Sequence, residues 1–480
     1  MATWNTSRSR FDAPLLVPRA DHPIVREWEC FSSCFTAFFI RRTRSSIEIG
    51  HGERTILNAK GLHRSAANLC AGLSEPRPAG DGRSMTNVLS HMPERLSSIK
   101  AFRGSRPRVE FAHLLRGIAA GSVLLHHFFY MFWNRPRIIA DLIVQPDLPH
   151  LVEKLPSFSI TDFGISDFWG HFGVALFFLV SGFVIPFSVG SLSRAGFVIA
   201  RVLRIWPTYM VGFTITVTCL AVNAACAGVA FPYRTWEVLS HYLIVPRWPT
   251  LTRPMDGILW TLEIELFFYF LCLLFSRKLR QFDLSIFFLS LLSVPIAVIA
   301  SLAVPTLFKW GLPVFAIVHW GSSMMQFLCF LLVGTAYHYF FQGCIDRSKL
   351  VMLHAVLLSA FFLSWRQGLM SEQGWSGPIS YLVAYVAFAI AFMCREGVSW
   401  LPQRLRYLFF GLADVSYPLY VVHGVLGYSI LAHAIEAGVG PGWALLLALA
   451  VAFALATILH VLVERPSQEL GRSLVRRYAV

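Results

Sequence analysis

The sequence contains few charged residues for its length. Asp, Glu, Lys and Arg make up 14% of the 480 residues, whereas an average soluble domain contains about 25%. This shortage argues against a row of ordinary soluble domains, which a chain of this length would otherwise suggest. Cysteines are also few, and most of them lie in apolar runs, where a thiol is most simply a small buried group. Cys30 and Cys34 have a spacing seen in zinc sites, but no second pair of ligands follows them, so we expect no bound metal.

Several motifs of soluble enzymes are absent. The chain has no G-x-S-x-G nucleophile turn, no P-loop and no dinucleotide fingerprint. Its formal net charge of +14 is not gathered on a basic face with interleaved aromatic residues. A nucleic-acid-binding surface is therefore not expected, and the positive charge needs another explanation.

Apolar residues, by contrast, are abundant at 55% of the chain. Ten apolar runs each approach the ~20 residues that a helix needs to cross a bilayer. They cover residues 109–134, 168–190, 208–231, 257–276, 282–304, 317–341, 349–366, 375–394, 410–434 and 442–463. The ninth run is the weakest, because Asp414, Pro418 and His423 interrupt it. The sequence therefore predicts an all-α polytopic integral membrane protein with about ten transmembrane helices.

The chain divides by composition into three parts. Residues 1–105 are rich in Arg, Ser, Pro and Gly, and we expect a basic, mostly disordered N-terminal extension there. The apolar run at residues 30–40 is too short to span a membrane. Residues 106–470 form the expected transmembrane domain, and residues 471–480 form a basic cytoplasmic tail.

Lysine and arginine residues predict the orientation. If the segment before the first run lies inside, the inner loops and ends hold more than twice as many of these residues as the outer loops. Cytoplasmic loops are enriched in both residue types. We therefore expect a multi-pass protein of the inner (plasma) membrane with both termini in the cytoplasm, and the net charge largely reflects this bias.

The first run carries two ionisable residues, Arg116 and His127. Such groups cost about 2.5–3.5 kcal/mol each at the centre of a membrane helix, so they usually face a polar interior. Eleven residues make three helical turns plus about 20°, which places both side chains on one face and about 16 Å apart. The two groups cannot touch, but they can line one cavity. His126 would point about 80° away from the arginine.

Six motifs then follow in chain order, and together they resemble those of the membrane acyltransferase 3 family. The first is Arg116-x10-His127, and the second is GVALFFLVSGF from Gly173, which is similar to G-V-D-L-F-F-x-x-S-G-F. The others are RVLRIWP from Arg201, WTLEIELFFY from Trp260, SYPLYVVH from Ser416 and VERP from Val463. The resemblance covers roughly residues 105–470. Ala175 stands where the second motif usually has Asp, and nothing shows that Asp167 or His171 upstream replaces it.

The resemblance implies an enzyme that moves an acyl group, often acetyl, from acyl-CoA to a hydroxyl of a carbohydrate. It implies catalytic roles for His127, Arg116 and Glu265. Histidine suits a general base because its unperturbed pKa of about 6.5 lies near working pH. Arg116 keeps its charge and offers a fork of donors to a phosphate or a pantetheine amide. Glu265 is interpreted as an acid that orients His127 or binds sugar hydroxyls, with Glu263 on another face of the same helix.

Further residues are expected to bind substrate. Arg201 and Arg204, three residues apart on a predicted cytoplasmic loop, suit the phosphates of CoA. Tyr269 shares a helical face with Glu265. The resemblance adds Trp260, Tyr420 and His423 as candidates for lining the substrate path.

Every one of these residues also has a purely structural interpretation, as a buried pair, a snorkelling arginine or a packing aromatic. The donor is expected to be acyl-CoA, with acetyl-CoA favoured, and no bound cofactor is expected. The partners are that donor, a carbohydrate or glycolipid acceptor such as an exopolysaccharide or O-antigen, and the bilayer. An alternative function is a glycan or lipid transporter or flippase that uses buried Arg, His and Glu as a translocation path. A third is a membrane scaffold or sensor in which the polar groups only hold helices together.

Overall fold

The computed structural model describes residues 109–153, 167–243, 255–310, 314–371, 376–395 and 402–478. These ranges contain helices and no β-strand. The expected N-terminal extension and the Cys30–Cys34 pair lie outside the described residues. The first half of the described chain forms α4 (Glu110–His126), the π-helix η3 (His127–Met131), α5 (Phe132–Asn134), α6 (Pro136–Ile143), α7 (Leu148–Glu153), α8 (Asp167–Ser191), α9 (Arg194–Cys226), α10 (Thr235–Tyr242), α12 (Leu259–Leu274) and α13 (Ser276–Arg280).

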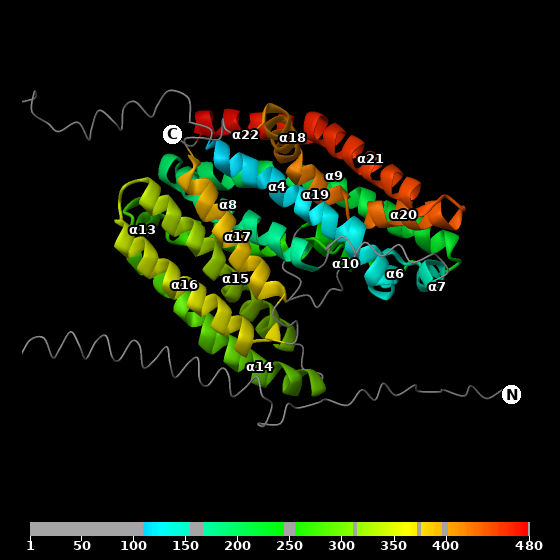
Figure 1. Ribbon diagram of the computed structural model, residues 1–480, viewed down its shortest axis with the longest axis horizontal. Helices are drawn as coiled ribbons and strands as arrows, with labels where there is room; N and C mark the ends of the chain where they lie inside the picture. The colour runs from blue at the N-terminus through cyan, green and yellow to red at the C-terminus, as the bar shows by residue number, and fades with distance from the viewer. Residues whose placement is uncertain are drawn as a thin grey trace, which may run out of the picture. The chain divides into compact units, whose positions relative to one another are not determined.

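The second half continues as helices joined by short turns. It comprises the 3₁₀ helix η5 (Leu284–Leu292), α14 (Ser293–Lys309), α15 (Val314–Phe341), α16 (Arg347–Gln367), α17 (Ser376–Met393), α18 (Gln403–Asp414), α19 (Ser416–Val422), α20 (Val425–Glu436), α21 (Pro441–Leu459), the π-helix η8 (His460–Glu464) and α22 (Arg465–Tyr478). Figure 1 shows most of the long helices running side by side.

Seven of the described helices are long and apolar enough to cross a membrane. The pair α19–α20 counts as an eighth if it forms one span bent by 54°. The remaining two expected spans fall on α4–η3–α5, which carries charged residues, and on α12, which has only 16 residues. The all-α, multi-pass membrane fold is therefore confirmed, and the count of ten is approximate.

The interruptions of the ninth expected span are real breaks. α18 ends at Asp414, and α19 begins at Ser416 after one intervening residue. A second break, at His423 and Gly424, separates α19 from α20. The second break is buried among neighbouring helices, which is where a membrane protein tolerates non-helical backbone.

One boundary was predicted wrongly. The expected third span begins at residue 208, but α9 begins at Arg194, so Arg201 and Arg204 lie inside a helix rather than on a loop. The Ser193 hydroxyl caps this helix by accepting a hydrogen bond of 3.1 Å from the Gly196 amide. Pro207 lies within the helix. A proline is tolerated in membrane helices when surrounding groups satisfy the freed backbone, so it did not mark the start of the span.

Glycines allow close approach at two helix contacts, between α8 and α15 and between α4 and α18. α8 packs against α4, α15 and α17. A Cβ atom at Gly182 of α8 would lie 1.9 Å from the Leu331 carbonyl oxygen of α15. A Cβ atom at Gly117 of α4 would lie 1.9 Å from the Phe409 carbonyl oxygen of α18. Small residues at helix contacts are typical of membrane bundles, and Gly182 lies at such a contact between α8 and α15.

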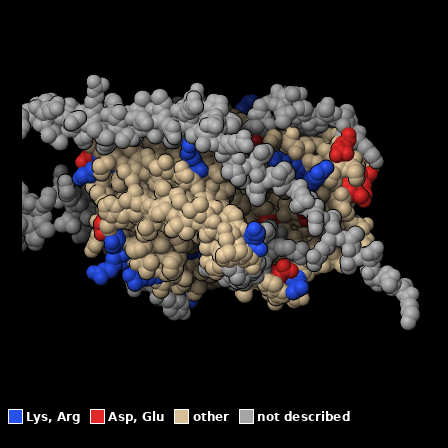
Figure 2. Space-filling model, turned by 90° about the horizontal axis from the view of Figure 1, so that it is seen from below, with Lys and Arg blue, Asp and Glu red and all other residues tan. Residues whose placement is uncertain are grey.

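The outer surface is mostly apolar. Large apolar side chains are exposed on α14, α16, α17 and α21, among them Leu302, Val351, Met393 and Trp443. Figure 2 shows a broad tan surface, with separate Lys and Arg groups around it and the larger Asp and Glu patches toward one end. A soluble protein rarely exposes apolar surface of this extent. A lipid environment accounts for it.

Candidate active site

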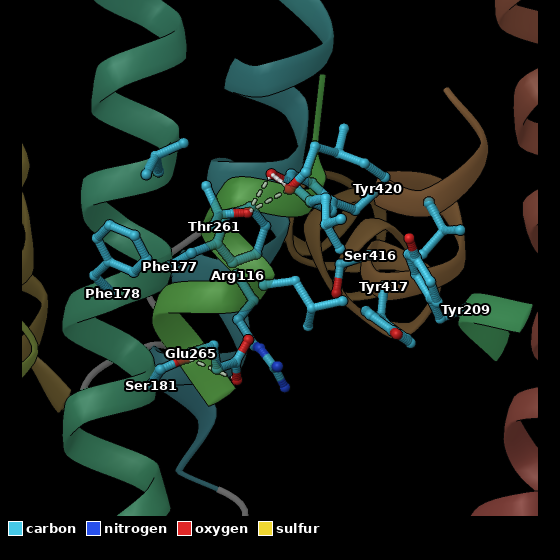
Figure 3. Close-up of a pocket in the computed structure, with 15 residues that line it drawn as sticks. Arg116, Phe177, Phe178, Ser181, Tyr209, Thr261, Glu265, Ser416, Tyr417 and Tyr420 are labelled. Atoms are coloured by element: carbon cyan, nitrogen blue, oxygen red, sulfur yellow. Dashed lines mark hydrogen bonds between the residues drawn. The ribbon is translucent and has the colours of Figure 1, made fainter. Parts of the chain in front are cut away.

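A small cavity lies between α4, α8, α9, α12 and α19. Its volume is about 70 Å³. It is lined by Arg116, Val174, Phe177, Phe178, Ser181, Tyr209, Ile258, Leu259, Thr261, Leu262, Glu265, Ser416, Tyr417, Tyr420 and Val421. Figure 3 shows Arg116, Glu265 and Ser181 at one end of the cavity and Thr261 with Tyr420 at the other. The walls between these polar ends are largely apolar, which suits a ligand with a short apolar segment between polar groups.

The first end of the cavity is built around Glu265. Its carboxylate accepts a hydrogen bond of 2.5 Å from the Tyr269 hydroxyl, one turn along α12. The Ser181 hydroxyl of α8 lies 3.5 Å from the same carboxylate oxygen. Figure 3 shows the Arg116 guanidinium beside this carboxylate. The two opposite charges interact electrostatically inside an apolar bundle, where such interactions are stronger than in water.

A second arginine is joined to this end through Tyr269. The Arg201 guanidinium lies 5.2 Å from the Tyr269 ring centroid and donates a hydrogen bond of 2.6 Å to the Ser188 hydroxyl. This stacking is a cation–π contact. Arg204, three residues further along α9, is close enough to interact electrostatically with Arg116. Glu464, from the VERP motif, also interacts with Arg116. The first end is thus a cluster of positive groups balanced by two carboxylates.

The second end of the cavity joins α12 to α19. The hydroxyls of Thr261 and Tyr420 lie 2.5 Å apart, and both contact the Ile258 carbonyl oxygen, at 3.0 and 3.3 Å. The Tyr420 ring centroid lies 5.7 Å from that of His423, the residue that follows α19. Tyr420 therefore connects the cavity to the break between α19 and α20.

A pair of histidines lies at that break. The ring centroids of His127 and His423 are 4.8 Å apart, with the rings nearly perpendicular. His127 is the first residue of the π-helix η3, and its Nδ1 atom forms a hydrogen bond with the hydroxyl of Tyr428 from α20. π-Helical turns inside longer helices often occur at functional sites. His127 is not among the residues that line the cavity, and it reaches the cavity through His423 and Tyr420.

Comparison with known proteins shows to which family the chain belongs. A family model described as an acyltransferase domain matches residues 109–462, which is most of the chain and includes every residue of the cavity. The chain belongs to the acyltransferase 3 family. It is therefore a membrane acyltransferase, as the order of motifs in the sequence indicated.

One named relative is similar over much of the same region. Nodulation protein 10 of Rhizobium leguminosarum bv. viciae is 25% identical over 343 residues, which cover 64% of this chain and 84% of the relative. No solved structure matches the chain significantly. The geometry of the site in this acyltransferase 3 member therefore comes from its own structure.

The structure brings together most of the residues that the sequence singled out. Arg116, Glu265 and Tyr420 line the cavity, and Tyr269 contacts Glu265 as the four-residue spacing predicted. His127 and His423 contact each other beside it. Glu263 is buried but does not line the cavity, in keeping with the choice of Glu265.

Two expectations are not matched by the geometry. Trp260 contacts Phe327 of α15, with ring centroids 5.6 Å apart, and does not line the cavity. The carboxylate of Glu265 contacts Tyr269 and Ser181 rather than His127. Arg116 and Glu265 line the cavity together, whereas His127 lies eleven residues further along the same helical segment, where its imidazole contacts α19 and α20.

The second motif usually has Asp where this chain has Ala175, and neither Asp167 nor His171 reaches the cavity in its place. Ala175 itself is fully buried. Asp167 lies 3.4 Å from the Arg135 guanidinium, and the His171 ring donates from Nδ1 to the Asp167 carbonyl oxygen at 3.0 Å. Both groups are therefore engaged in local contacts near the end of α8 where the helix begins.

Sequence reasoning missed Tyr428, Thr261 and Tyr417. Tyr428 is 301 residues from its partner His127, and no helical spacing relates the two. Tyr417 donates a hydrogen bond of 2.9 Å to the Ile205 carbonyl oxygen of α9 and so fixes α19 against it. Within the described ranges no group of three or more His, Cys, Asp or Glu residues is arranged to hold a metal ion.

Proposed function

We propose that the protein is an O-acyltransferase that moves an acyl group from acyl-CoA to a hydroxyl of a carbohydrate acceptor. The acceptor class is an exopolysaccharide, an O-antigen or a glycolipid. The observation that carries the proposal is the connection from the Arg116–Glu265 end of the cavity, through Tyr420, to the His127–His423 pair. Such a connection lets a thioester bound among arginines reach imidazoles that handle protons.

The donor is proposed to bind at the end that holds the arginines. Arg201 and Arg204 lie on α9 beside that end, and paired guanidinium groups suit the phosphates of CoA. A single buried water occupies about 10–15 Å³ of such a cavity. A cavity of about 70 Å³ therefore admits a small acyl group and favours acetyl over a long acyl chain.

The transfer is proposed to be direct. Two serine hydroxyls line the cavity, but Ser181 contacts Glu265 and Ser416 donates a hydrogen bond of 2.8 Å to the Ala413 carbonyl oxygen. Neither hydroxyl is hydrogen-bonded to an imidazole, the pairing that activates a nucleophilic serine. The acceptor hydroxyl is then the group that attacks the thioester, and its proton passes to the histidine pair.

The membrane is proposed to be the inner membrane, with both termini cytoplasmic. The described helices place Arg277, Lys278 and Arg280 on α13 and further arginines on α22. Positive residues are enriched on the cytoplasmic side of membrane proteins. This orientation brings acyl-CoA from the cytoplasm to the arginines of the cavity.

The test uses purified protein, acetyl-CoA and the total glycan fraction of a strain from which the gene is deleted. We expect thiol release that depends on the glycan and matches the ester formed. Vesicles containing the protein are assayed in parallel for glycan movement. Movement of glycan without thiol release would contradict the proposal and support a transporter.

A further inference from the structure

The break between α19 and α20 places two polar side chains on His127. α19 ends at Val422, His423 and Gly424 separate it from α20, and the two helices differ in direction by 54°. Tyr428 follows one turn into α20. A Cβ atom at Gly427 would lie 2.3 Å from the Phe128 ring, so α20 approaches η3 closely at this point. The imidazole of His127 therefore meets His423 from one half of the broken helix and Tyr428 from the other.

The hydrogen bonds of His423 define its tautomer. Its Nδ1 atom lies 3.0 Å from the Leu419 carbonyl oxygen and 2.9 Å from that of Tyr420. Carbonyl oxygens only accept hydrogen bonds, so Nδ1 carries the hydrogen and Nε2 carries the lone pair. The side chain is 1% exposed, and Nε2 has no hydrogen-bond partner among the described residues. His423 thus presents a buried basic nitrogen beside His127.

The hydrogen bond between Tyr428 and His127 defines the second tautomer. If Nδ1 of His127 donated to the phenol, the hydrogen of the Tyr428 hydroxyl would need an acceptor, and the described residues supply none. Leaving a buried donor without an acceptor is unfavourable. Tyr428 is 1% exposed, so the favoured arrangement has its hydroxyl donating to Nδ1. Nε2 of His127 then carries the hydrogen and is a donor, not a base.

We propose that His423 is the general base of the reaction and that His127 is the proton donor to the leaving group. This assignment rests on the proposed function and divides the proton transfers between the two rings. It differs from the roles expected from the sequence, which made His127 the base and gave His423 to substrate binding. Tyr428 holds the tautomer of His127 through its hydroxyl and shares the proton of that hydrogen bond with the ring.

The proposed step balances in atoms and charge. Nε2 of His423 takes the proton of the acceptor hydroxyl while the oxygen bonds to the thioester carbon. The C–S bond breaks, and Nε2 of His127 gives its proton to the departing sulfur, which leaves as the CoA thiol. The Tyr428 hydroxyl gives its proton to Nδ1 at the same time, so the His127 ring stays neutral. The imidazolium of His423 then returns a proton to Nε2 of His127, whose ring centroid is 4.8 Å away, and Nδ1 returns its proton to the Tyr428 phenolate. The products are one ester and one thiol, and both imidazoles return to their starting tautomers.

The test is chemical rescue of His423→Ala and His127→Ala in the assay of thiol release from acetyl-CoA with the glycan fraction of the deletion strain. Neutral N-methylimidazole has a ring lone pair but no N–H, so it replaces a base and not a donor. At about pH 8, where added imidazoles are mostly neutral, we expect it to raise the rate of His423→Ala at least tenfold and to leave His127→Ala unchanged. Imidazole itself should restore both variants. Rescue of His127→Ala by N-methylimidazole, without rescue of His423→Ala, would overturn the assignment.

A second measurement tests the assignment if neither imidazole nor N-methylimidazole enters the site. His423→Gln should lower kcat at least about a hundredfold, the usual size of a lost general base, with KM nearly unchanged. Tyr428→Phe should lower kcat about tenfold, because His127 loses the donor that fixes its tautomer. A His423→Gln enzyme with kcat within threefold of wild type would contradict the proposal.

A matched control separates these effects from misfolding. His354 is another buried histidine, on α16, and its ring nitrogen lies 3.1 Å from the Tyr385 hydroxyl. His354→Ala should keep its activity and show no response to either imidazole. All variants are compared by size-exclusion chromatography. If the wild-type protein itself releases no thiol in the presence of glycan, the proposed function fails, whereas an active wild type with an active His423→Gln variant refutes only the assignment of the base.

Discussion

The contact between α8 and α15 supports the cavity, and replacing Gly182 by alanine tests it. A Cβ atom there would lie 1.9 Å from the Leu331 carbonyl oxygen, whereas ordinary contacts begin near 3.4 Å. The two helices would have to separate by about 1.5 Å, the difference between these distances. The same movement would disturb the hydrogen bond of 3.1 Å from the Thr335 hydroxyl to the Gly182 carbonyl oxygen.

The expected loss of stability follows from this displacement. Adding atoms to a well-packed interior usually costs about 1–3 kcal/mol. At the reciprocal position, a Cβ atom on Gly334 would lie 2.3 Å from the Leu179 carbonyl oxygen, so the required separation and the loss are smaller. A Cβ atom at Gly321, also on α15, meets nothing within 4 Å. Alanine there should be neutral or stabilise by up to about 1 kcal/mol, because glycine is a poor helix residue.

Thermal unfolding in detergent and acyl-transfer rates measure the two consequences. We expect Gly182→Ala to unfold at the lowest temperature, followed by Gly334→Ala, with Gly321→Ala equal to or above wild type. Activity should fall with Gly182→Ala, because Phe178 and Ser181 on the same helix line the cavity. A Gly182→Ala protein as stable and as active as Gly321→Ala would refute the close packing on which the position of α8 depends.

Three further predictions concern the site. Tyr269→Phe removes a hydrogen bond of 2.5 Å to the Glu265 carboxylate, and such bonds contribute about 1.5–3 kcal/mol. We therefore expect kcat to fall at least tenfold, and an unchanged kcat would show that this contact is only structural. Arg201→Lys keeps the charge but loses the planar group stacked on Tyr269. KM for acyl-CoA should therefore rise several-fold with little change in kcat, and a fall in kcat alone would argue against phosphate binding. His127→Gln should lose at least about a hundredfold of its activity while His126→Gln retains most of it, and the reverse order would show that the wrong imidazole has been assigned to the site.

The fold was largely predictable because its main determinant is local. Runs of about 20 apolar residues mark membrane helices wherever they occur, and each of the ten runs falls on helical structure in the described ranges. The start of α9 was missed because the expected span was limited to the apolar run from residue 208, whereas the helix also includes Arg201 and Arg204. The direction taken by α20 after Gly424 was also out of reach, because a bend at a break depends on packing against other helices.

The site was predictable to the extent that its contacts follow regular spacing. Glu265 and Tyr269 lie on one helix, so four residues of separation sufficed to pair them. The pairing of His127 with Tyr428 joins segments 301 residues apart across a broken helix. The segment from Arg116 to His127 is helical as expected, but helical spacing alone does not show which side chains of α19 and α20 meet His127. Local periodicity therefore identified the groups but not which of them meet.

We propose that the enzyme uses the cavity at Arg116 and the adjoining imidazoles to esterify a surface glycan. The most direct test is the amount of alkali-labile ester on the glycans of the deletion strain, complemented with wild-type protein or with an Arg116→Gln variant present at equal levels in the membrane. The account predicts that the ester is absent from the deletion strain, is restored by the wild type and stays below about a tenth of that level with the variant. Normal ester in the deletion strain, or full restoration by the variant, would contradict it.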